Sequence, residues 1–136
     1  MRPILLDTNA YTGFMRGEPE VVEVIARAGK ILLTSVVLGE LLAGFAAGTR
    51  EPKNRAELAR FIESPRVEVL PVTAETADSY ALVWLGLRRK GQPIPTNDLW
   101  IAASTMEHGA ALLTRDAHFA HIEGLRCGWR LADLLP

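Results

Sequence analysis

The stretch PILLDTNAY, residues 3–11, places an acidic residue directly after a short apolar run. The run from Ile4 to Leu6 predicts a strand buried on both faces of a sheet, and Asp7 falls at the carboxyl end of that strand. Similar strands are expected at ILLT (31–34), VEVLPV (67–72) and ALLT (111–114). Because helical patterns separate these runs, the sequence predicts an α/β fold with three layers, α/β/α, around a mainly parallel central sheet.

The segments between the expected strands carry helix signals. Helices are expected at 18–29, at 35–48, within 50–64, at 73–90 and from 96 to about 108. Their ends are indicated by Pro19 in a first turn, Ser35 as a cap, Gly91 after a last turn and Thr96 as an N-cap. The residues after Asp116 are expected to form a short tail.

Length and composition favour one compact domain over residues 1–136, since 49% of the 136 residues are hydrophobic. The single cysteine, Cys127, rules out an internal disulfide. No leader or long apolar run is present, so a cytoplasmic protein without a membrane segment is expected. The net charge is −1, and any attraction to phosphate must therefore come from local cations.

Acidic residues occur where ligands bind in such folds. The carboxyl ends of parallel strands meet at one edge of the sheet, and Asp7 and Asp116 follow two of the strands. Glu40 lies about one turn into the helix after the second strand, and Asp98 lies in the first turn of another helix. We therefore expect all of these carboxylates to face one cleft.

Each acid also has a simpler interpretation. Asp7 and Asp116 suit caps or turns, and first-turn acids such as Asp98 are common because the helix N-terminus is positive. Glu40 is harder to explain in this way, because it is the only charged residue of its apolar helix and needs water, a donor or a cation.

Several carboxylates in one cleft repel one another, and a divalent cation would relieve that repulsion. Oxygen ligands favour Mg²⁺ or Mn²⁺, and without metal the crowding is expected to raise the pKa of at least one carboxyl group. Zinc spacing is missing, since His108 suits a helix end and His118 and His121 suit the surface. Polar neighbours that could hold the acids, or could simply be turn and cap residues, are Thr8, Asn9, Thr96, Asn97 and Thr114. A site of this kind suits phosphodiester hydrolysis.

Several separate motifs are similar to those of a known family. LLDTNAY, the apolar helix with Glu40, GQPIPTNDLWIAA, EHGAALLTRDAHF and IEGL resemble a PIN-domain ribonuclease, and more closely the VapC-type toxins of bacterial type II toxin–antitoxin systems. The resemblance runs from about Ile4 to Leu125. It implies Mg²⁺- or Mn²⁺-dependent RNA cleavage by Asp7, Glu40, Asp98 and Asp116, with Asp7 and Asp98 contacting metal most directly and Thr114 as the family's hydroxyl.

Other classes fit less well. A haloacid-dehalogenase phosphatase needs a second acid two residues after the first, where this chain has Asn9, and a receiver domain needs an acidic pair and a lone lysine. Trp84 and Trp100 could stack on bases in a pure RNA-binding module, although their helical spacing favours the core. The remaining alternative is a catalytically inactive PIN-like scaffold that binds RNA or protein.

RNA binding requires basic residues near the acidic cleft. The candidates for substrate binding are Arg16, Arg88, Arg89, Lys90 and Arg115. A solvated helix end explains the run from 88 to 90 equally well.

Partner chains are expected because the helix at 35–48 is apolar almost all round and a small domain has limited means to cover it. Part of this surface, with the helix bearing Trp84, is expected to meet another chain. The resemblance implies a homodimer and a cognate antitoxin whose tail crosses the cleft. A self-contained core with Trp84 inside is the alternative.

Overall fold

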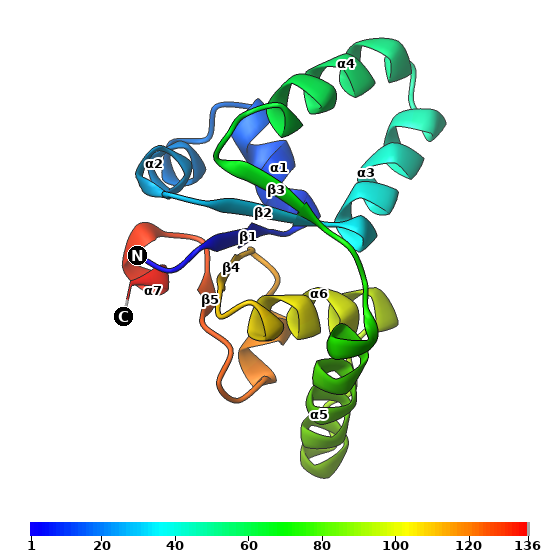
Figure 1. Cartoon of the computed structure of the whole chain (residues 1–136), viewed down its shortest axis with the longest axis vertical. Coiled ribbons are helices and arrows are strands. Elements are labelled where there is room, and N and C mark those ends of the chain that lie inside the picture. The colour runs from blue at the N-terminus through cyan, green and yellow to red at the C-terminus, as the bar shows by residue number, and fades with distance from the viewer. Residues whose placement is uncertain (136) are drawn as a thin grey trace.

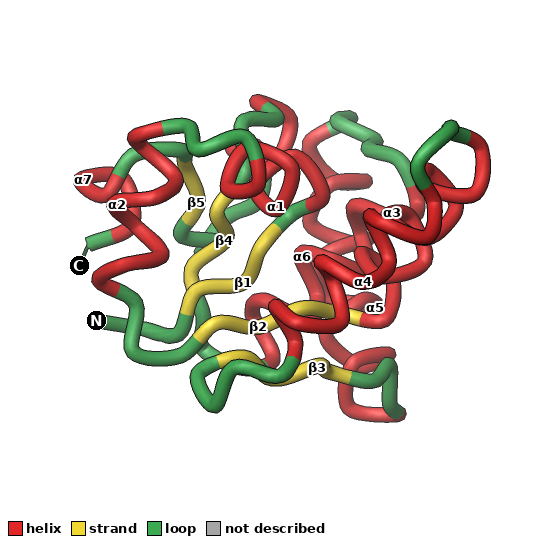
Figure 2. The backbone as a smooth tube through the Cα atoms, turned by 90° about the horizontal axis from the view of Figure 1, so that it is seen from above, coloured by secondary structure: helices red, strands yellow, loops and turns green. Residues whose placement is uncertain are grey.

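The computed structural model describes residues 1–135 and contains one five-stranded sheet in the order β3-β2-β1-β4-β5. Every strand pairs in parallel with its neighbours. The strands are β1 (Ile4–Leu6), β2 (Ile31–Thr34), β3 (Val67–Leu70), β4 (Ala111–Leu113) and β5 (Cys127–Gly128). Figure 2 shows them side by side, with β3 and β5 at the two edges. The expected α/β fold is confirmed, and the mainly parallel sheet is parallel throughout.

Helices cover both faces of the sheet, which explains why the three inner strands, β1, β2 and β4, are continuous apolar runs. The helices are α1 (Thr8–Met15), α2 (Pro19–Arg27), α3 (Ser35–Ala47), α4 (Glu51–Ile62), α5 (Ala74–Lys90), α6 (Thr96–Glu107), the 3₁₀ helix η1 (Ala117–His121) and α7 (Leu131–Leu134). In Figure 1, α1 to α4 lie on one side of the sheet, and α5 and α6 lie on the other. The side chains of β1, β2 and β4 are buried accordingly.

The order of the strands reverses next to β1. The chain moves outward from β1 through β2 to β3, and then returns to place β4 on the opposite side of β1. The segments that follow β1 and β4 consequently leave toward opposite faces of the sheet. A reversal of this kind opens a crevice at the carboxyl ends of the two strands, where ligands bind in open α/β sheets.

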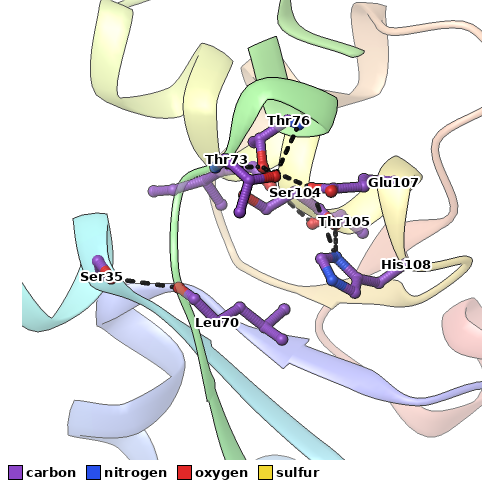
Figure 3. A network of polar contacts seen from close by, with 9 residues as sticks. Ser35, Leu70, Thr73, Thr76, Ser104, Thr105, Glu107 and His108 are labelled. Carbon is purple, nitrogen blue, oxygen red and sulfur yellow. Dashed lines mark hydrogen bonds and ion pairs between the residues drawn. The ribbon is translucent and has the colours of Figure 1, made fainter. Parts of the chain in front are cut away.

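Two helix starts, those of α1 and α3, differ from the sequence-based expectation. Helix α1 was not expected, and the Asp7 side chain caps it by accepting from the Thr8 N–H at 2.8 Å. Thr34 rather than Ser35 caps α3, since its Oγ1 accepts from the Val37 N–H at 3.0 Å. Ser35 instead donates to the Leu70 carbonyl at 3.2 Å, which attaches the start of α3 to the end of β3 (Figure 3).

The start of α6 also differs. Thr96 was expected as the N-cap, but the N-cap is Pro95, which has no side-chain donor or acceptor, and Thr96 is the first helical residue. A proline disfavours helical backbone angles at the residue before it, so Pro95 keeps Ile94 out of the helix. Asp98 still lies in the first turn, as expected.

A polar network holds the start of α5 against the end of α6 (Figure 3). Thr73 and Thr76 form a capping box, and the Thr76 hydroxyl donates to Glu107 Oε1 at 2.7 Å. His108, the expected helix-end residue, is the C-cap of α6, and its Nδ1 lies 3.0 Å from the Ser104 carbonyl. These contacts fix the carboxyl end of α6, so the other end, with Asp98, is held toward the crevice.

Part of the apolar surface stays uncovered. The Trp84 side chain is 43% exposed and Leu82 is 73% exposed, so the expectation that Trp84 is a core aromatic is wrong. In α3 only Val37 and Leu41 are buried. Helical spacing alone predicted an apolar face for α5, but it could not say whether this chain or another one covers that face. Within residues 1–135, no helix is both long and apolar enough to cross a bilayer.

Candidate active site and metal centre

The four acids predicted from the sequence line one open cleft at the carboxyl ends of β1 and β4. Its volume is about 360 Å³, and Asp7, Glu40, Asp98 and Asp116 all contribute to its wall. Asp7 comes from the end of β1, Asp116 from the segment after β4, and Glu40 and Asp98 from α3 and α6. The cleft therefore occupies the crevice that the reversal of strand order creates.

Asp7 is the most deeply placed of these acids, with 3% of its surface exposed. Its Oδ1 caps α1, and its Oδ2 accepts from the Thr114 hydroxyl at 2.7 Å and from the Asn9 amide at 3.5 Å. Burial raises the pKa of Asp7, the bonds from Thr114 and Thr8 lower it, and the charges of Asp98 and Asp116 raise it further. The donors keep a buried carboxylate in one orientation beside two other acids.

Glu40 joins three elements at the wall of the cleft. Its Oε1 accepts from the Thr8 hydroxyl at 2.5 Å, and its Oε2 accepts from the Asn97 amide at 3.4 Å. The glutamate of α3 thus holds the first turns of α1 and α6 together. These donors replace the hydration that an acid on an apolar helix loses.

Asp98, Asp116 and His118 form a compact group of possible metal ligands. One ligand atom from each of the three residues lies within 4.8 Å of the others. Nε2 of His118 is 2.5 Å from Oδ2 of Asp98. His118 was expected at the surface without a role, and the structure corrects this, because the imidazole contacts an acid of the cleft.

Burial and neighbouring charges together raise the pKa of Asp98. Burial raises the pKa of this carboxyl group, the bond and charge of His118 lower it, and the charges of Asp116 and Glu40 raise it. The expectation that at least one pKa is raised is confirmed for Asp7 and Asp98, but burial is the largest cause in both. Repulsion among the acids adds to it.

The comparisons with known proteins agree on one family. The profile described as PIN domain matches residues 4–125. Ribonuclease VapC4 of Mycobacterium tuberculosis is 32% identical over 123 residues, which cover 88% of this chain and 91% of that protein. This chain is a PIN-domain protein of the VapC family. The tRNA(fMet)-specific endonuclease VapC of Shigella flexneri is 28% identical, with 93% of this chain and 96% of that protein covered.

Solved structures show the same fold for the PIN domain. A crystal structure of VapBC2 from Rickettsia felis bound to a promoter DNA fragment matches with a TM-score of 0.80 and 27% identity, covering 93% of this chain and 97% of that one. DNA-bound VapBC from Salmonella typhimurium matches with a TM-score of 0.81 and 26% identity, covering 94% and 98%.

Four of the five polar residues expected beside the acids of this PIN domain touch them or their neighbours. Thr8 and Asn97 donate to Glu40, and Asn9 and Thr114 donate to Asp7. Thr96 differs, because it lines another groove together with Trp84 and Arg88. Its side chain leaves the cleft because Thr96 precedes Asp98 by two residues, which is about half a helical turn.

The expected basic residues fall into two groups. Arg16 and Arg115 line the cleft. Arg88, Arg89 and Lys90 lie at the end of α5, outside the residues of the cleft, where Lys90 donates to the His121 carbonyl at 2.8 Å and Arg88 lies over Trp84. The latter placement agrees with the simpler interpretation of a solvated helix end.

Arg115 has a fixed surrounding that the sequence did not indicate. Its guanidinium pairs with Glu18 and lies 4.0 Å from the centre of the Trp129 ring. A Cβ atom on Gly13 would come within 3.1 Å of both Glu18 and Trp129, so the glycine permits this close packing. Glu18 and Trp129 lie far from Arg115 in the chain and carry no periodic signal, which is why only the structure reveals them.

Proposed function

We propose that this protein is a divalent-metal-dependent endoribonuclease, the toxin of a toxin–antitoxin module, that hydrolyses RNA phosphodiester bonds in the acidic cleft. The observation that carries the proposal is the convergence of Asp7, Asp98 and Asp116 on one cleft, in a chain that belongs to the VapC family. The relatives named above are described as a ribonuclease and a tRNA endonuclease, which supports RNA as the substrate.

The residues of the cleft fit a hard divalent cation. Asp98 and Asp116 offer carboxylate oxygens in a compact group, and they lie close enough to Asp7 for their charges to raise the pKa of Asp7. Carboxylate ligands favour Mg²⁺ or Mn²⁺ over zinc. We propose that Asp7, Asp98 and Asp116 hold the ion, with Glu40 supporting them. When bound, the ion would neutralise charge on the scissile phosphate and activate a water molecule.

The remaining groups of the cleft have positioning roles in this proposal. Thr114 and the Thr8 N–H fix the Asp7 carboxylate, and Glu40 ties α1 to α6 so that Asp7 and Asp98 keep their relative places. Arg16 and Arg115 supply positive charge at the rim of the acidic cleft. Guanidinium groups bind phosphate in a bidentate way, and these two are placed to hold the RNA backbone.

We also propose that the protein acts in the cytoplasm as a homodimer that an antitoxin chain binds. The VapBC structures of Rickettsia felis and Salmonella typhimurium are complexes with DNA, and VapBC-5 of Mycobacterium tuberculosis is described as a member of the VapBC family of toxin–antitoxin systems, which supports an antitoxin partner. The exposed side chains of Leu82 and Trp84 on α5 and the thinly covered helix α3 offer apolar surface for these contacts.

Cleavage of labelled RNA tests the catalytic proposal. Purified protein is incubated with Mg²⁺, with Mn²⁺ and with EDTA, and we expect cleavage only with metal. Asp7→Asn and Asp98→Asn are expected to reduce it at least about 100-fold, because each removes a charged ligand oxygen. Asp78→Asn is the matched control, since Asp78 is an exposed acid of α5 outside the cleft.

Circular dichroism and thermal melts show whether each variant is folded. Both cleft variants are expected to stay folded, because asparagine also caps a helix and removes repulsion from the metal-free cleft. Full cleavage by either variant contradicts the assignment of that acid. Metal-independent RNA binding without any cleavage by the unaltered protein supports the catalytically inactive scaffold instead.

A further inference from the structure

His118 is the one imidazole that reaches the acids of the cleft within residues 1–135. It lies in η1, two residues after Asp116, and its Nε2 is 2.5 Å from Oδ2 of Asp98 in α6. The contact therefore connects the segment after β4 with the first turn of α6. The side chain thus bonds to one acid proposed to hold metal and lies two residues from another, Asp116.

The imidazole is held by the core. The neighbouring Phe119 is fully buried, and its ring centre lies 5.1 Å from that of His118. The His118 side chain is 36% exposed and the Asp98 side chain only 13%, so the bond is partly shielded from solvent. A half-covered ring beside a buried anchor has a defined position and can orient its partner.

The contact is too short for an ion to lie between the two atoms. Metal–ligand distances of about 2.0–2.2 Å keep two ligand atoms of one ion roughly 3 Å apart, whereas a strong charge-assisted hydrogen bond is shorter. With Asp98 ionised, Oδ2 can only accept, so Nε2 carries the proton in this bond and donates it to Oδ2. One oxygen of Asp98 is engaged by the imidazole, and the other is left for a cation.

We propose that His118 is a positioning residue that donates its Nε2–H to Asp98 Oδ2 and so presents the other Asp98 oxygen to the cation shared with Asp116. This inference rests on the proposed metal-dependent function. It assigns a role to a side chain that neither the four-acid pattern nor its spacing indicates.

The chain offers a matched control in the same 3₁₀ helix. His121 is exposed, and its contact with Lys90 uses the backbone carbonyl rather than the imidazole. His121→Ala therefore removes an imidazole from η1 without touching the cleft. A general effect of removing an imidazole from η1 should appear in both His118→Ala and His121→Ala. An effect of losing the contact with Asp98 should appear only in His118→Ala.

Binding of Mn²⁺ to the full chain without RNA tests the proposal, measured by the loss of the free-ion signal in electron paramagnetic resonance. Because partners of metal ligands typically contribute 10–100-fold to metal affinity, His118→Ala is expected to weaken Mn²⁺ binding about 10–100-fold. His118→Gln is expected to recover part of the loss, since its amide also donates. His121→Ala is expected to bind like the unaltered protein. In cleavage assays kcat should fall for His118→Ala while KM for RNA stays close to that of the unaltered protein.

The outcomes separate this inference from the proposed function. If the unaltered protein binds no Mn²⁺, the metal-dependent function itself fails. If Asp98→Asn loses Mn²⁺ while His118→Ala and His118→Gln retain full affinity, only the role of His118 is overturned. A nitrogen coupling to bound Mn²⁺ that disappears in His118→Ala also overturns it, because the imidazole would then be a direct ligand. If His118→Ala does not fold, His118→Gln decides the question.

Discussion

The substitution Thr114→Val tests the network that holds Asp7 in place. The Thr114 hydroxyl is buried, donates to Asp7 Oδ2 at 2.7 Å and accepts from the Asp116 N–H at 3.1 Å. Valine has nearly the same shape and removes only the hydroxyl. The substitution thus leaves a buried carboxylate oxygen without its shortest donor, and it creates little cavity.

The size of the effect follows from these two bonds. A hydrogen bond to a charged group contributes about 1.5–3 kcal/mol, and the partly exposed Asp116 N–H can find water at a cost of roughly 0–1 kcal/mol. We expect the metal-free protein to lose about 2–3 kcal/mol of unfolding free energy at neutral pH. For a chain of this length that corresponds to a fall in Tm of roughly 6–15 °C.

The loss should depend on pH with a definite sign. The pKa of Asp7 is higher in the folded protein than in the unfolded chain. Ionising this group therefore lowers the free energy of unfolding as the pH rises from the unfolded pKa through the folded pKa. Thr114 lowers that cost, because its bond favours the charged form. Without that bond the folded pKa of Asp7 rises further, so the penalty of Thr114→Val is complete above the folded pKa that Asp7 has in the variant, and it shrinks as the pH falls from there toward the folded pKa of the unaltered protein.

Urea and thermal unfolding of the metal-free protein between about pH 4 and pH 8 measures this penalty. Thr105→Val is the matched control, since Thr105 is fully buried and its hydroxyl donates at 2.8 Å to the Ile101 carbonyl within α6. The control is expected to lose less than about 1 kcal/mol, independent of pH, because no charge is involved. Equal losses at both positions, or a loss at Thr114 that does not change with pH, would refute the reasoning.

Two further predictions concern binding. Replacing Arg16 and Arg115 by glutamine in an Asp98→Asn background should weaken RNA binding, measured by fluorescence anisotropy. The slope of log affinity against log salt concentration should become shallower by about 0.7 per lost phosphate contact. The same change at Arg88, Arg89 and Lys90 should alter neither the affinity nor the slope. An equal loss from the second set would extend the RNA path along α5. Light scattering of the purified chain should show a dimer that Leu82→Glu shifts toward monomer, whereas a monomer of the unaltered chain at micromolar concentration contradicts the homodimer. Co-expression with the antitoxin expected from the adjacent gene should yield a complex without ribonuclease activity.

The strands were the most predictable part of the fold. Short continuous apolar runs identified β1, β2 and β4, because strands buried on both faces select such residues, whereas the edge strand β3, VEVL, alternates with the exposed Glu68. The predictions at 67–72 and 111–114 extended beyond the observed ends by two residues and one residue, respectively. Strand β5 was missed, since Cys127 and Gly128 form a strand only through pairing with Leu112 and Leu113 of β4.

Helix α1 was missed for a different reason. Its sequence, TNAYTGFM, contains a glycine and two threonines and shows no apolar periodicity. Tertiary contacts stabilise it instead, with the Asp7 cap at its start and Ala10, Tyr11 and Gly13 buried. The N-cap of α3 was predicted one residue too late, because Thr34 and Ser35 are adjacent hydroxyl residues that can both cap a helix. In the structure the Ser35 hydroxyl bonds to Leu70, and the Thr34 hydroxyl caps the helix.

The acids of the site were predictable because sheet topology brings strand ends together, whatever the side chains are. His118, Glu18 and Trp129 were not, because their contacts depend on how η1 and the segment after β5 pack. The position of Trp84 shows the same limit. Its spacing identified an apolar face correctly, but exposure depends on what lies opposite, and the sequence of one chain does not contain that information.

The role of a helix cap and the role of a metal ligand are compatible at this site. Asp7 caps α1 through Oδ1, and Asp98 lies in the first turn of α6, so both carboxylates stand at the positive end of a helix dipole. That field favours the charged form of each group against burial and against its acidic neighbours. A helix start is thus a suitable position for a ligand that must remain ionised before the cation arrives. Asp98 can thus be both an ordinary first-turn acid and the metal ligand proposed above. What sets it apart from other first-turn acids is the neighbouring carboxylate of Asp116.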